Sequence, residues 1–207
     1  MRHATAHTSE DYVSHEGWRD ATLEACPLHP GGGCGFSRHG TYPRVRPAGT
    51  RVGRYRCPEG HVTFSLLPDC LASRFSASLD ELEATIVAVE EQRAAGATME
   101  AAAAAVRPDV DVVTALRWVY RRLVPIRDAV RALETVMPAL VGSAGEVRAV
   151  RDTLVTTRAL CALRAAPWSA MALLPAPLGV GPRRKKRKRI CPGSQHETGA
   201  DPPPRKR

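Results

Sequence analysis

Residues 26–68 read CPLHPGGGCGFSRHGTYPRVRPAGTRVGRYRCPEGHVTFSLLP, and this stretch decides how the first third of the chain folds. It holds three of the six cysteines and three of the seven histidines, but few large apolar side chains. A segment of about forty residues with so little to bury cannot be stabilised by a hydrophobic core alone. Thiolate and imidazole groups bind zinc tetrahedrally, and structural zinc contributes folding free energy directly. The stretch therefore predicts a zinc ribbon with a structural Zn²⁺ over residues 25–70.

Two pairs of candidate ligands frame this stretch. The first pair is Cys26 and Cys34, on either side of a glycine-rich loop, and the second pair is Cys57 and His61. His29 is an alternative partner for Cys26, with CxxH spacing, and its use would leave Cys34 spare. The bland alternative is that these residues are unrelated reduced thiols and histidines in a loop-rich segment.

The segment between the ligand pairs has the composition of short strands. Residues 41–46 and 52–56 are predicted to be two strands joined by a turn at 47–49, and residues 62–66 are a candidate third strand. With the helices predicted below, this gives an α+β chain in which two or three short strands precede a mainly helical part.

The net charge of +9 is unevenly distributed along the chain. Residues 182–207 hold ten lysines and arginines and only two acids, so the rest of the chain is close to neutral. Within that rest, six arginines and no acid lie between Glu24 and Glu59. A localised basic face indicates a polyanionic partner better than the total charge does. The candidate DNA contacts in this region are Arg38, Arg44, Arg54 and Arg56.

Three helices are predicted next, over residues 79–95, 98–106 and 111–123, within a region that spans 78–124. Ser78 and Thr98 are predicted N-caps of the first two. A helix, a tight turn and a short helix bearing threonine, arginine and tryptophan is the layout of a helix-turn-helix, whose second helix enters the major groove. The alternative is a plain three-helix bundle with solvated arginines. The predicted DNA contacts on the third helix are Thr114, Arg117, Arg121 and Arg122.

The segments outside these two regions carry weaker patterns. Residues 1–24 lack periodicity and predict a disordered or loosely docked arm, which Trp18 and Leu23 would tuck against the next domain. Residues 166–207, with seven consecutive basic residues at 183–189, predict a disordered basic tail.

Residues 125–165 predict a helical hairpin. Pro125 and Pro138 are expected to interrupt its helices, and a glycine-containing turn is expected at 142–145. Apolar residues on its two arms would face each other as in an antiparallel helix pair. The hairpin serves either as packing support or as the surface of a homodimer, and the sequence leaves both open.

Several motifs of the first region resemble the N-terminal zinc-ribbon region of insertion-sequence transposases and of related short bacterial proteins of unknown function. The matching residues are Cys26-Pro27, Cys34-Gly35, Arg38-His39-Gly40-Thr41-Tyr42-Pro43-Arg44, Arg54-Tyr55-Arg56-Cys57 and Thr63-Phe64-Ser65-Leu66-Leu67-Pro68. The resemblance covers roughly residues 25–123 and implies that a helix-turn-helix follows the ribbon. The sequence departs from the family at the second ligand pair, where the family usually has CxxC and this chain has Cys57 and His61.

The chemistry of a transposase is not expected in this chain. Its catalytic domain needs three carboxylates that bind two metal ions. The acids left after residue 125 have no predicted strands to hold them, and no activated nucleophile is visible elsewhere, so we expect no enzyme activity. These acids are Asp128, Glu134, Glu146 and Asp152.

Two functional hypotheses follow. The first is a zinc-dependent protein that binds double-stranded DNA, transposase-like but without a catalytic domain, and without a small-molecule substrate. The second is a structural or protein-interaction module whose basic tail binds nucleic acid or acidic partners nonspecifically. The chain has no apolar run of membrane-span length and no segment of signal-peptide type, so we expect a cytoplasmic, nucleoid-associated protein with no membrane partner.

Overall fold

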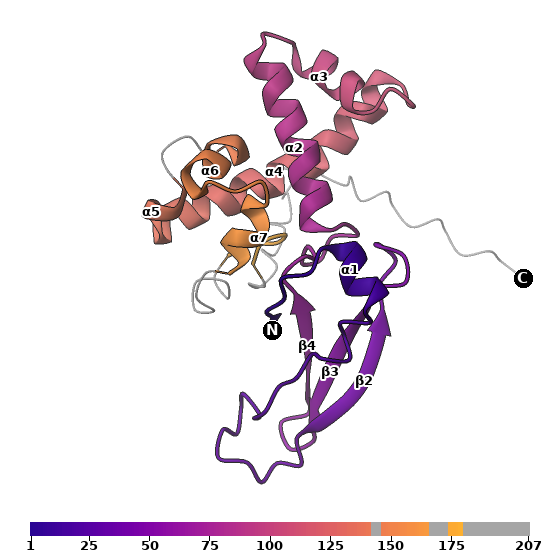
Figure 1. Ribbon diagram of the computed structural model, residues 1–207, viewed down its shortest axis with the longest axis vertical. Helices are drawn as coiled ribbons and strands as arrows, with labels where there is room; N and C mark the ends of the chain where they lie inside the picture. The colour runs from indigo at the N-terminus through magenta and orange to yellow at the C-terminus, as the bar shows by residue number, and fades with distance from the viewer. Residues whose placement is uncertain (142–145, 166–173, 180–207) are drawn as a thin grey trace, which may run out of the picture.

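The computed structural model of the chain describes residues 1–141, 146–165 and 174–179. A small sheet with one short helix, the sheet half, lies below a set of packed helices, the helical half (Figure 1). The sheet half contains β1 (Arg2–His3), α1 (Ser9–Ser14), β2 (Ser37–Pro43), β3 (Arg51–Cys57) and β4 (Val62–Pro68). The helical half contains α2 (Leu79–Ala94), α3 (Met99–Val106), α4 (Val112–Val136), α5 (Pro138–Val141), α6 (Val147–Leu154) and α7 (Ala159–Arg164). The predicted α+β class is confirmed.

The sheet has the strand order β1-β4-β3-β2. β2, β3 and β4 are antiparallel neighbours, so all three predicted strands exist. β3 and β4 lie close to the predicted bounds, but β2 starts four residues earlier than predicted and shares only residues 41–43 with the predicted strand 41–46. The predicted turn between β2 and β3 is present: Thr50 N–H donates to the carbonyl of Pro47, and Gly49 adopts a φ of +78°. Gly53 of β3 approaches the Ala21 side chain so closely that a Cβ there would lie 3.3 Å from it.

The first twenty-four residues differ from the disordered or loosely docked arm that the sequence predicts. β1 pairs in parallel with β4, and α1 is capped by the Thr8 side chain. Tyr12 is fully buried, and with Trp18 it joins an apolar cluster that includes Val52 of β3. The arm is therefore part of the sheet half. Its pairing is with distant residues, which is why local periodicity did not reveal it.

α2, α3 and α4 begin where the sequence predicts helices to begin. Ser78 and Glu81 form a capping box at α2, and the Thr98 hydroxyl accepts a hydrogen bond from Ala101 N–H at α3. Asp111 caps α4 in the same way. The three helices share one core of small aliphatic side chains with α6 and α7.

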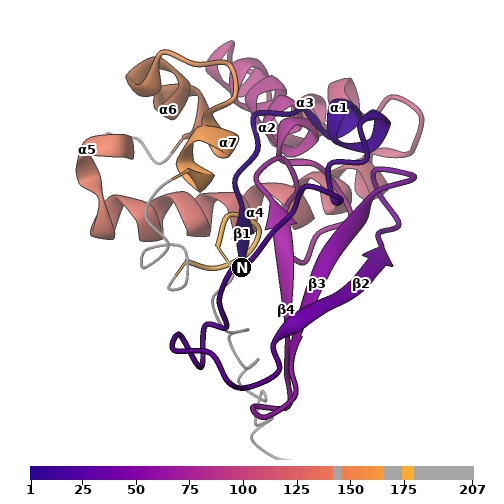
Figure 2. The same cartoon turned by 60° about the horizontal axis from the view of Figure 1, so that its bottom comes forward.

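The predicted helical break at Pro125 is wrong, because α4 continues through it for a total of 25 residues (Figure 2). Proline removes one backbone hydrogen bond of the helix and strains the preceding turn. Buried residues on both sides of it, among them Leu123, Ile126 and Leu133, hold the two segments against the same core. Tertiary packing therefore overrides the local preference.

α6 and α7 start against carboxylates of α2. Neither helix has a side-chain cap of its own. Glu90 instead accepts hydrogen bonds from the Val147 and Arg148 N–H groups, and Glu83 accepts them from the Ala159 and Leu160 N–H groups. Glu83 is 1% exposed and also pairs with Arg151 at 2.6 Å.

Residues 125–165 consequently do not form a simple two-helix hairpin. The end of α4, short α5, and α6 and α7 packed on α2 take its place. The predicted turn at 142–145 lies outside the described residues.

The predicted tail begins later than residue 166. Leu174 and Leu178 are buried in the helical core, and the carbonyl of Pro177 accepts hydrogen bonds from Ser73 N–H and from the buried Arg164. Residues 166–173 and 180–207 of that tail lie outside the described residues, so the predicted disorder of the basic run is not addressed.

Arginines connect the two halves. Arg158 of the helical half pairs with Asp80 at 2.9 Å and donates to the carbonyls of Ala6 and His7 in the N-terminal segment. Arg44, just after β2, donates to the carbonyls of Ala72 and Phe75 in the loop before α2. These contacts fix the sheet against the start of α2.

Candidate metal centre

A compact loop between α1 and β2 carries the first three polar side chains of the site. The His29 N–H donates to the Cys26 carbonyl at 3.1 Å, which closes a tight turn and puts the two side chains on the same side. Gly32 and Gly33 then adopt φ values of +82° and +83°, a region that other residues rarely enter. This reversal returns the chain so that Cys34 faces the turn.

The fourth side chain comes from the end of a strand. Cys57 is the last residue of β3, and a tight turn follows it in which Gly60 N–H donates to the Cys57 sulfur at 3.2 Å. A Cβ on Gly60 would lie 2.7 Å from Leu28 Cδ1 and 3.3 Å from that sulfur. Glycine is therefore required here by the close approach of the two loops.

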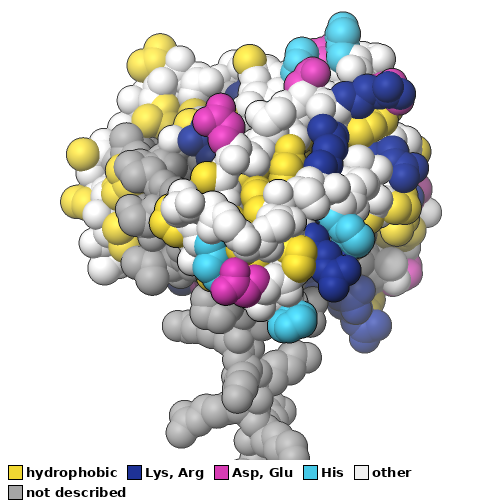
Figure 3. Space-filling model, turned by 90° about the horizontal axis from the view of Figure 1, so that it is seen from below, with side chains coloured by type: hydrophobic (Ala, Val, Ile, Leu, Met, Phe, Trp, Pro, Cys, Tyr) yellow, Lys and Arg dark blue, Asp and Glu magenta, His cyan; other side chains and the backbone are white. Residues whose placement is uncertain are grey.

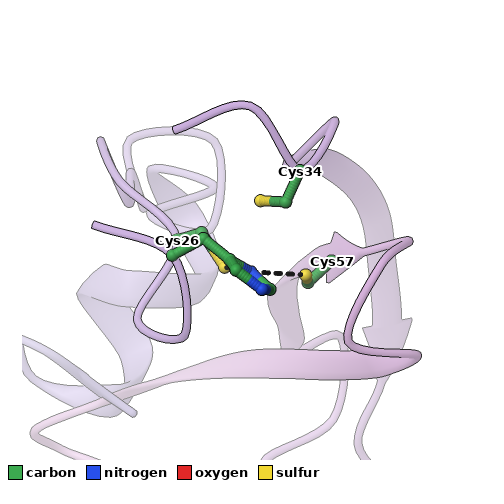
Figure 4. A group of neighbouring side chains, drawn as sticks. Cys26, Cys34 and Cys57 are labelled. Carbon is green, nitrogen blue, oxygen red and sulfur yellow. Dashed lines mark hydrogen bonds between the residues drawn. The ribbon is translucent and has the colours of Figure 1, made fainter. Parts of the chain in front are cut away.

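The four side chains converge on one point. One ligand atom from each of Cys26, His29, Cys34 and Cys57 lies within 4.8 Å of all the others. Figure 4 shows the three cysteine side chains gathered around one point, with Cys26 on one side and Cys34 and Cys57 on the other. The three cysteines are between 0% and 5% exposed, so the cluster is closed to solvent apart from the half-buried histidine.

The spacing fits a tetrahedral zinc site. His29 Nδ1 lies 3.3 Å from the Cys57 sulfur and 3.6 Å from the Cys26 sulfur. With Zn–S of about 2.3 Å and Zn–N of about 2.0 Å, a tetrahedron places sulfur and nitrogen about 3.5 Å apart and two sulfurs about 3.8 Å apart. Three thiols with one imidazole are the soft donor set that zinc prefers and that Mg²⁺ or Ca²⁺ does not. The residues present therefore fit a structural zinc ion.

The cluster contains three members of the predicted ligand set and differs from that set in the fourth. The structure brings together Cys26, Cys34 and Cys57, but it adds His29 and leaves His61 out. His61 is exposed, with a φ of +50°, because the turn after Cys57 uses its four residues to place Gly60 N–H against sulfur. His29 was the alternative in the sequence, but Cys34 is not spare. The CxxH spacing and the glycine three residues after Cys57 were the available signals.

The surroundings of the cluster are apolar on one side and acidic on the other. Phe36 and Phe64 pack against the thiols, and Phe36 stacks on Tyr55 with ring centroids 5.3 Å apart. A carboxylate oxygen of Glu59 lies 3.8 Å from Nε2 of His29, on the side away from the sulfurs. Metal-bound histidines usually have such a partner, which orients the ring. Sequence reasoning did not single out Glu59 or Gly60.

The thiols of the cluster differ in their pKa. Burial opposes ionisation of Cys26, but hydrogen bonds from His29 and from backbone N–H groups outweigh it and lower the Cys26 pKa to about 7. Burial and the neighbouring Cys26 thiol raise the Cys34 pKa. Of these two thiols, Cys26 is therefore the more easily deprotonated when a cation arrives.

The arginines predicted to contact DNA separate into two groups. Arg38 donates to the carbonyls of Trp18 and Arg19, and Arg44 is held by the carbonyls of Ala72 and Phe75, so these two guanidinium groups are engaged within the fold. Arg54 and Arg56 make no ion pair or hydrogen bond with the described residues. Arginine side chains gather along one side of the sheet end of the molecule (Figure 3).

The predicted contacts on α4 are also divided. Thr114, Arg117 and Arg121 are exposed on one side of the helix. Arg122 is half-buried on another side, where its guanidinium lies 3.6 Å from the centre of the Trp118 ring and donates to the Trp118 carbonyl. The guanidinium carbon of Arg107 also lies 4.8 Å from the centre of the Trp118 ring. Arg122 is thus a packing residue as well as a cation.

No family model, curated protein or solved structure matches this chain. Among the helices of the described residues, none combines the length and the apolar character that crossing a bilayer requires.

Proposed function

We propose that this chain is a zinc-stabilised protein that binds double-stranded DNA. Cys26, His29, Cys34 and Cys57 would hold a structural Zn²⁺, and the exposed side of α4 would contact the duplex. The observation that carries the proposal is the closed Cys₃His cluster, because a saturated set of four ligands suits a structural ion and leaves no position for catalysis.

The role of the zinc ion would be to fix the long loop of residues 24–36 to the end of β3. The apolar clusters of the sheet half are small, and two of them are joined only through the partly buried Phe36 and Phe64. An ion bound by residues from both segments supplies the free energy that these clusters lack. Arg54 and Arg56, on the strand that carries Cys57, would be positioned by the same ion.

α4 is the best candidate for the duplex contact. Thr114, Arg117 and Arg121 are exposed within the first three turns of this helix. A helix of this kind presents its first turns to base edges and phosphates. The resemblance of the quoted motifs to insertion-sequence transposases supports the same role. The proposed protein is therefore transposase-like in its DNA-binding part and has no catalytic domain.

One observation favours protein interaction as a second candidate. Val113, Tyr120 and Val124 are 55%, 46% and 48% exposed on the same side of α4 as Arg117 and Arg121. Spacing of seven and four residues puts them in one stripe along the helix. A second copy of the chain that covered this stripe would make α4 a dimer contact.

The experiment combines metal content with DNA binding in the full chain. The basic run 183–189 is replaced by serine and glutamine in every sample, so that nonspecific tail binding does not mask the signal. We expect one zinc per chain and a duplex affinity that falls as salt rises. Replacing Arg117 and Arg121 with alanine should weaken duplex binding about tenfold or more. The slope of log affinity against log salt concentration should also decrease by the amount expected for the loss of about two phosphate contacts.

Arg148→Ala is the matched control, because Arg148 is an exposed arginine on α6. It should leave the duplex affinity unchanged. Unaltered binding by the α4 double variant would contradict the DNA role. A concentration-dependent dimer that Tyr120→Arg abolishes, without any duplex binding, would support the second candidate instead. Absence of bound zinc in a folded protein would refute the metal part.

A further inference from the structure

One side of the sheet carries a hollow that the metal cluster does not use. Tyr42, Arg54, Thr63 and Ser65 line a shallow hollow of about 390 Å³, one residue or more from each of β2, β3 and β4. Arg56 lies two residues beyond Arg54 and is paired with Thr63, so strand alternation places it on the same side. We call this set of five residues the open face.

The open face has an unbalanced positive charge. β2, β3 and β4 contain no aspartate or glutamate. Arg54 is paired across the strands with Ser65, and Arg56 with Thr63, so each guanidinium has a hydroxyl neighbour and no carboxylate. The two arginines make no ion pair within the described part of the chain. This contrasts with Arg38 and Arg44, whose guanidinium groups donate to backbone carbonyls within the fold.

An aromatic ring adjoins these charges. The Arg54 guanidinium carbon lies 5.8 Å from the centre of the Tyr42 ring, at the outer limit of a cation–π contact. The ring is half-buried: one part packs against the cluster of Tyr12, Val52 and Leu67, and another part lines the hollow. Packing on one side holds the ring in place, which reduces the entropy lost when a ligand stacks on it.

The combination of a fixed ring, two unpaired guanidiniums and two hydroxyls matches a chain that alternates planar bases with phosphates. Unpaired bases stack on aromatic rings, and arginine binds phosphate through two N–H groups at once. A duplex keeps its base faces stacked inside the helix, so they are not available to stack on a protein ring, whereas the bases of a single strand are. An acidic peptide would satisfy the arginines but not use the ring.

We propose that the open face is a binding site for single-stranded nucleic acid, with a base stacked on Tyr42 and phosphates held by Arg54 and Arg56. Thr63 and Ser65 donate hydrogen bonds to phosphate or base oxygens beside them. The inference rests on the nucleic-acid-binding part of the proposed function, but it does not depend on α4. The sheet would then bind an unpaired strand while the helix binds the duplex.

The test measures fluorescence anisotropy of the full chain with a labelled twelve-nucleotide thymidine strand and with a twelve-base-pair duplex. As before, residues 183–189 are neutralised in every sample. Arg54→Gln with Arg56→Gln should weaken binding of the single strand at least tenfold. Tyr42→Leu should weaken it roughly fivefold or more, whereas Tyr42→Phe, which retains the ring, should bind as the parent does.

Controls keep the result attributable to the open face. Arg51→Gln changes an arginine of the same strand whose Nε already donates to the Thr41 hydroxyl, and it should leave single-strand binding unchanged. The Arg117→Ala, Arg121→Ala double variant should lose the duplex and keep the single strand. Zinc content and near-ultraviolet circular dichroism show that each variant is folded, and the arginine double variant replaces Tyr42→Leu if that substitution unfolds the sheet.

The outcomes separate the two proposals. Duplex binding that depends on α4, with no single-strand binding or with equal single-strand affinity for all variants, would overturn the inference and leave the proposed function standing. Single-strand binding lost in the open-face variants, without any duplex binding, would support the inference and refute the role of α4. A polyglutamate peptide that competes as well as the thymidine strand would overturn the assignment to nucleic acid.

Discussion

The sheet half and the helical half of this chain are stabilised by different means. The helical half has one continuous core that α2, α3, α4, α6 and α7 share. The sheet half divides its apolar residues among three small clusters, one of which consists of the thiols of Cys26, Cys34 and Cys57 with two phenylalanines. A half without a continuous core needs another source of free energy, and the cysteine cluster is the feature that can supply it. The two halves should therefore respond to different perturbations.

Loss of a metal ligand should produce the largest effect, and only in the sheet half. Cys57→Ser removes the side chain of the proposed zinc site that joins β3 to the loop of residues 24–36. We expect the variant to lose most of its zinc and the sheet to unfold, while the helical circular dichroism signal persists. Atomic absorption and circular dichroism check this. His61→Ala is the matched control and should keep full zinc occupancy. Equal losses in both variants would restore the ligand set predicted from the sequence.

Removal of a buried carboxylate should produce the largest effect in the helical half. Glu83→Ala leaves Arg151 unpaired and the N–H groups of Ala159 and Leu160 without acceptors. Breaking a buried charge pair from one side costs about 3–5 kcal/mol of unfolding free energy. Urea unfolding with zinc present measures it. Glu91→Ala, an exposed glutamate of the same helix, should change stability by less than about 0.5 kcal/mol.

The contacts between the two halves should contribute less stability than the interactions within either half. Arg44→Met removes the two hydrogen bonds to the carbonyls of Ala72 and Phe75. Buried carbonyls left without donors cost about 1–3 kcal/mol, and the two halves should begin to melt at separate temperatures. Calorimetry would reveal the second transition. Arg46→Met, an exposed arginine two residues later, should behave as the parent does; similar destabilisation by both would argue against the specific link.

A substitution at Pro125 should strengthen the helical half alone. Since α4 runs through this position, Pro125→Ala restores a helical hydrogen bond and removes the ring clash, for a gain of about 1–2 kcal/mol after the more flexible unfolded chain is taken into account. The melting temperature of the helical signal should rise. If the chain breaks at this proline, as the sequence alone suggests, the substitution will not stabilise the protein.

The smallest effect should appear as a pH dependence. The pKa of Glu90 is raised, mainly because burial disfavours its charged form, and the nearby Glu146 raises it further. Hydrogen bonds from the backbone N–H groups of Arg148 and Val147, and the charge of Arg127, lower the pKa but do not outweigh burial. The Glu90 carboxyl therefore keeps its proton to a higher pH in the folded state than in the unfolded state. Stability from this group is present below the ordinary glutamate pKa and decreases as pH rises through the raised one. Glu90→Gln should flatten the slope of unfolding free energy just above pH 4.5, and Glu91→Gln should not.

The sequence predicted those features that depend on near neighbours. Ser78, Thr98 and the alternation in residues 52–56 act within a few positions, so the helix starts and the strands were correct. β1, the burial of Tyr12, and the capping of α6 and α7 by Glu90 and Glu83 depend on residues more than fifty positions apart or on packing of whole elements. The sequence also left the choice between His29 and His61 open. The conformation of the four-residue turn after Cys57 decides that choice, and the spacing of the residues does not reveal it.

The seven-residue interval between Glu83 and Glu90 has a consequence for how this chain tolerates changes in length. Seven residues are about two helical turns, or roughly 10 Å along α2. The first turns of α7 and α6 are therefore held at a fixed interval along one rod. Inserting a single residue between the two glutamates would rotate one of them by about 100° and detach one helix start. Substitutions on the outer surface of this segment are tolerable, but insertions and deletions are not.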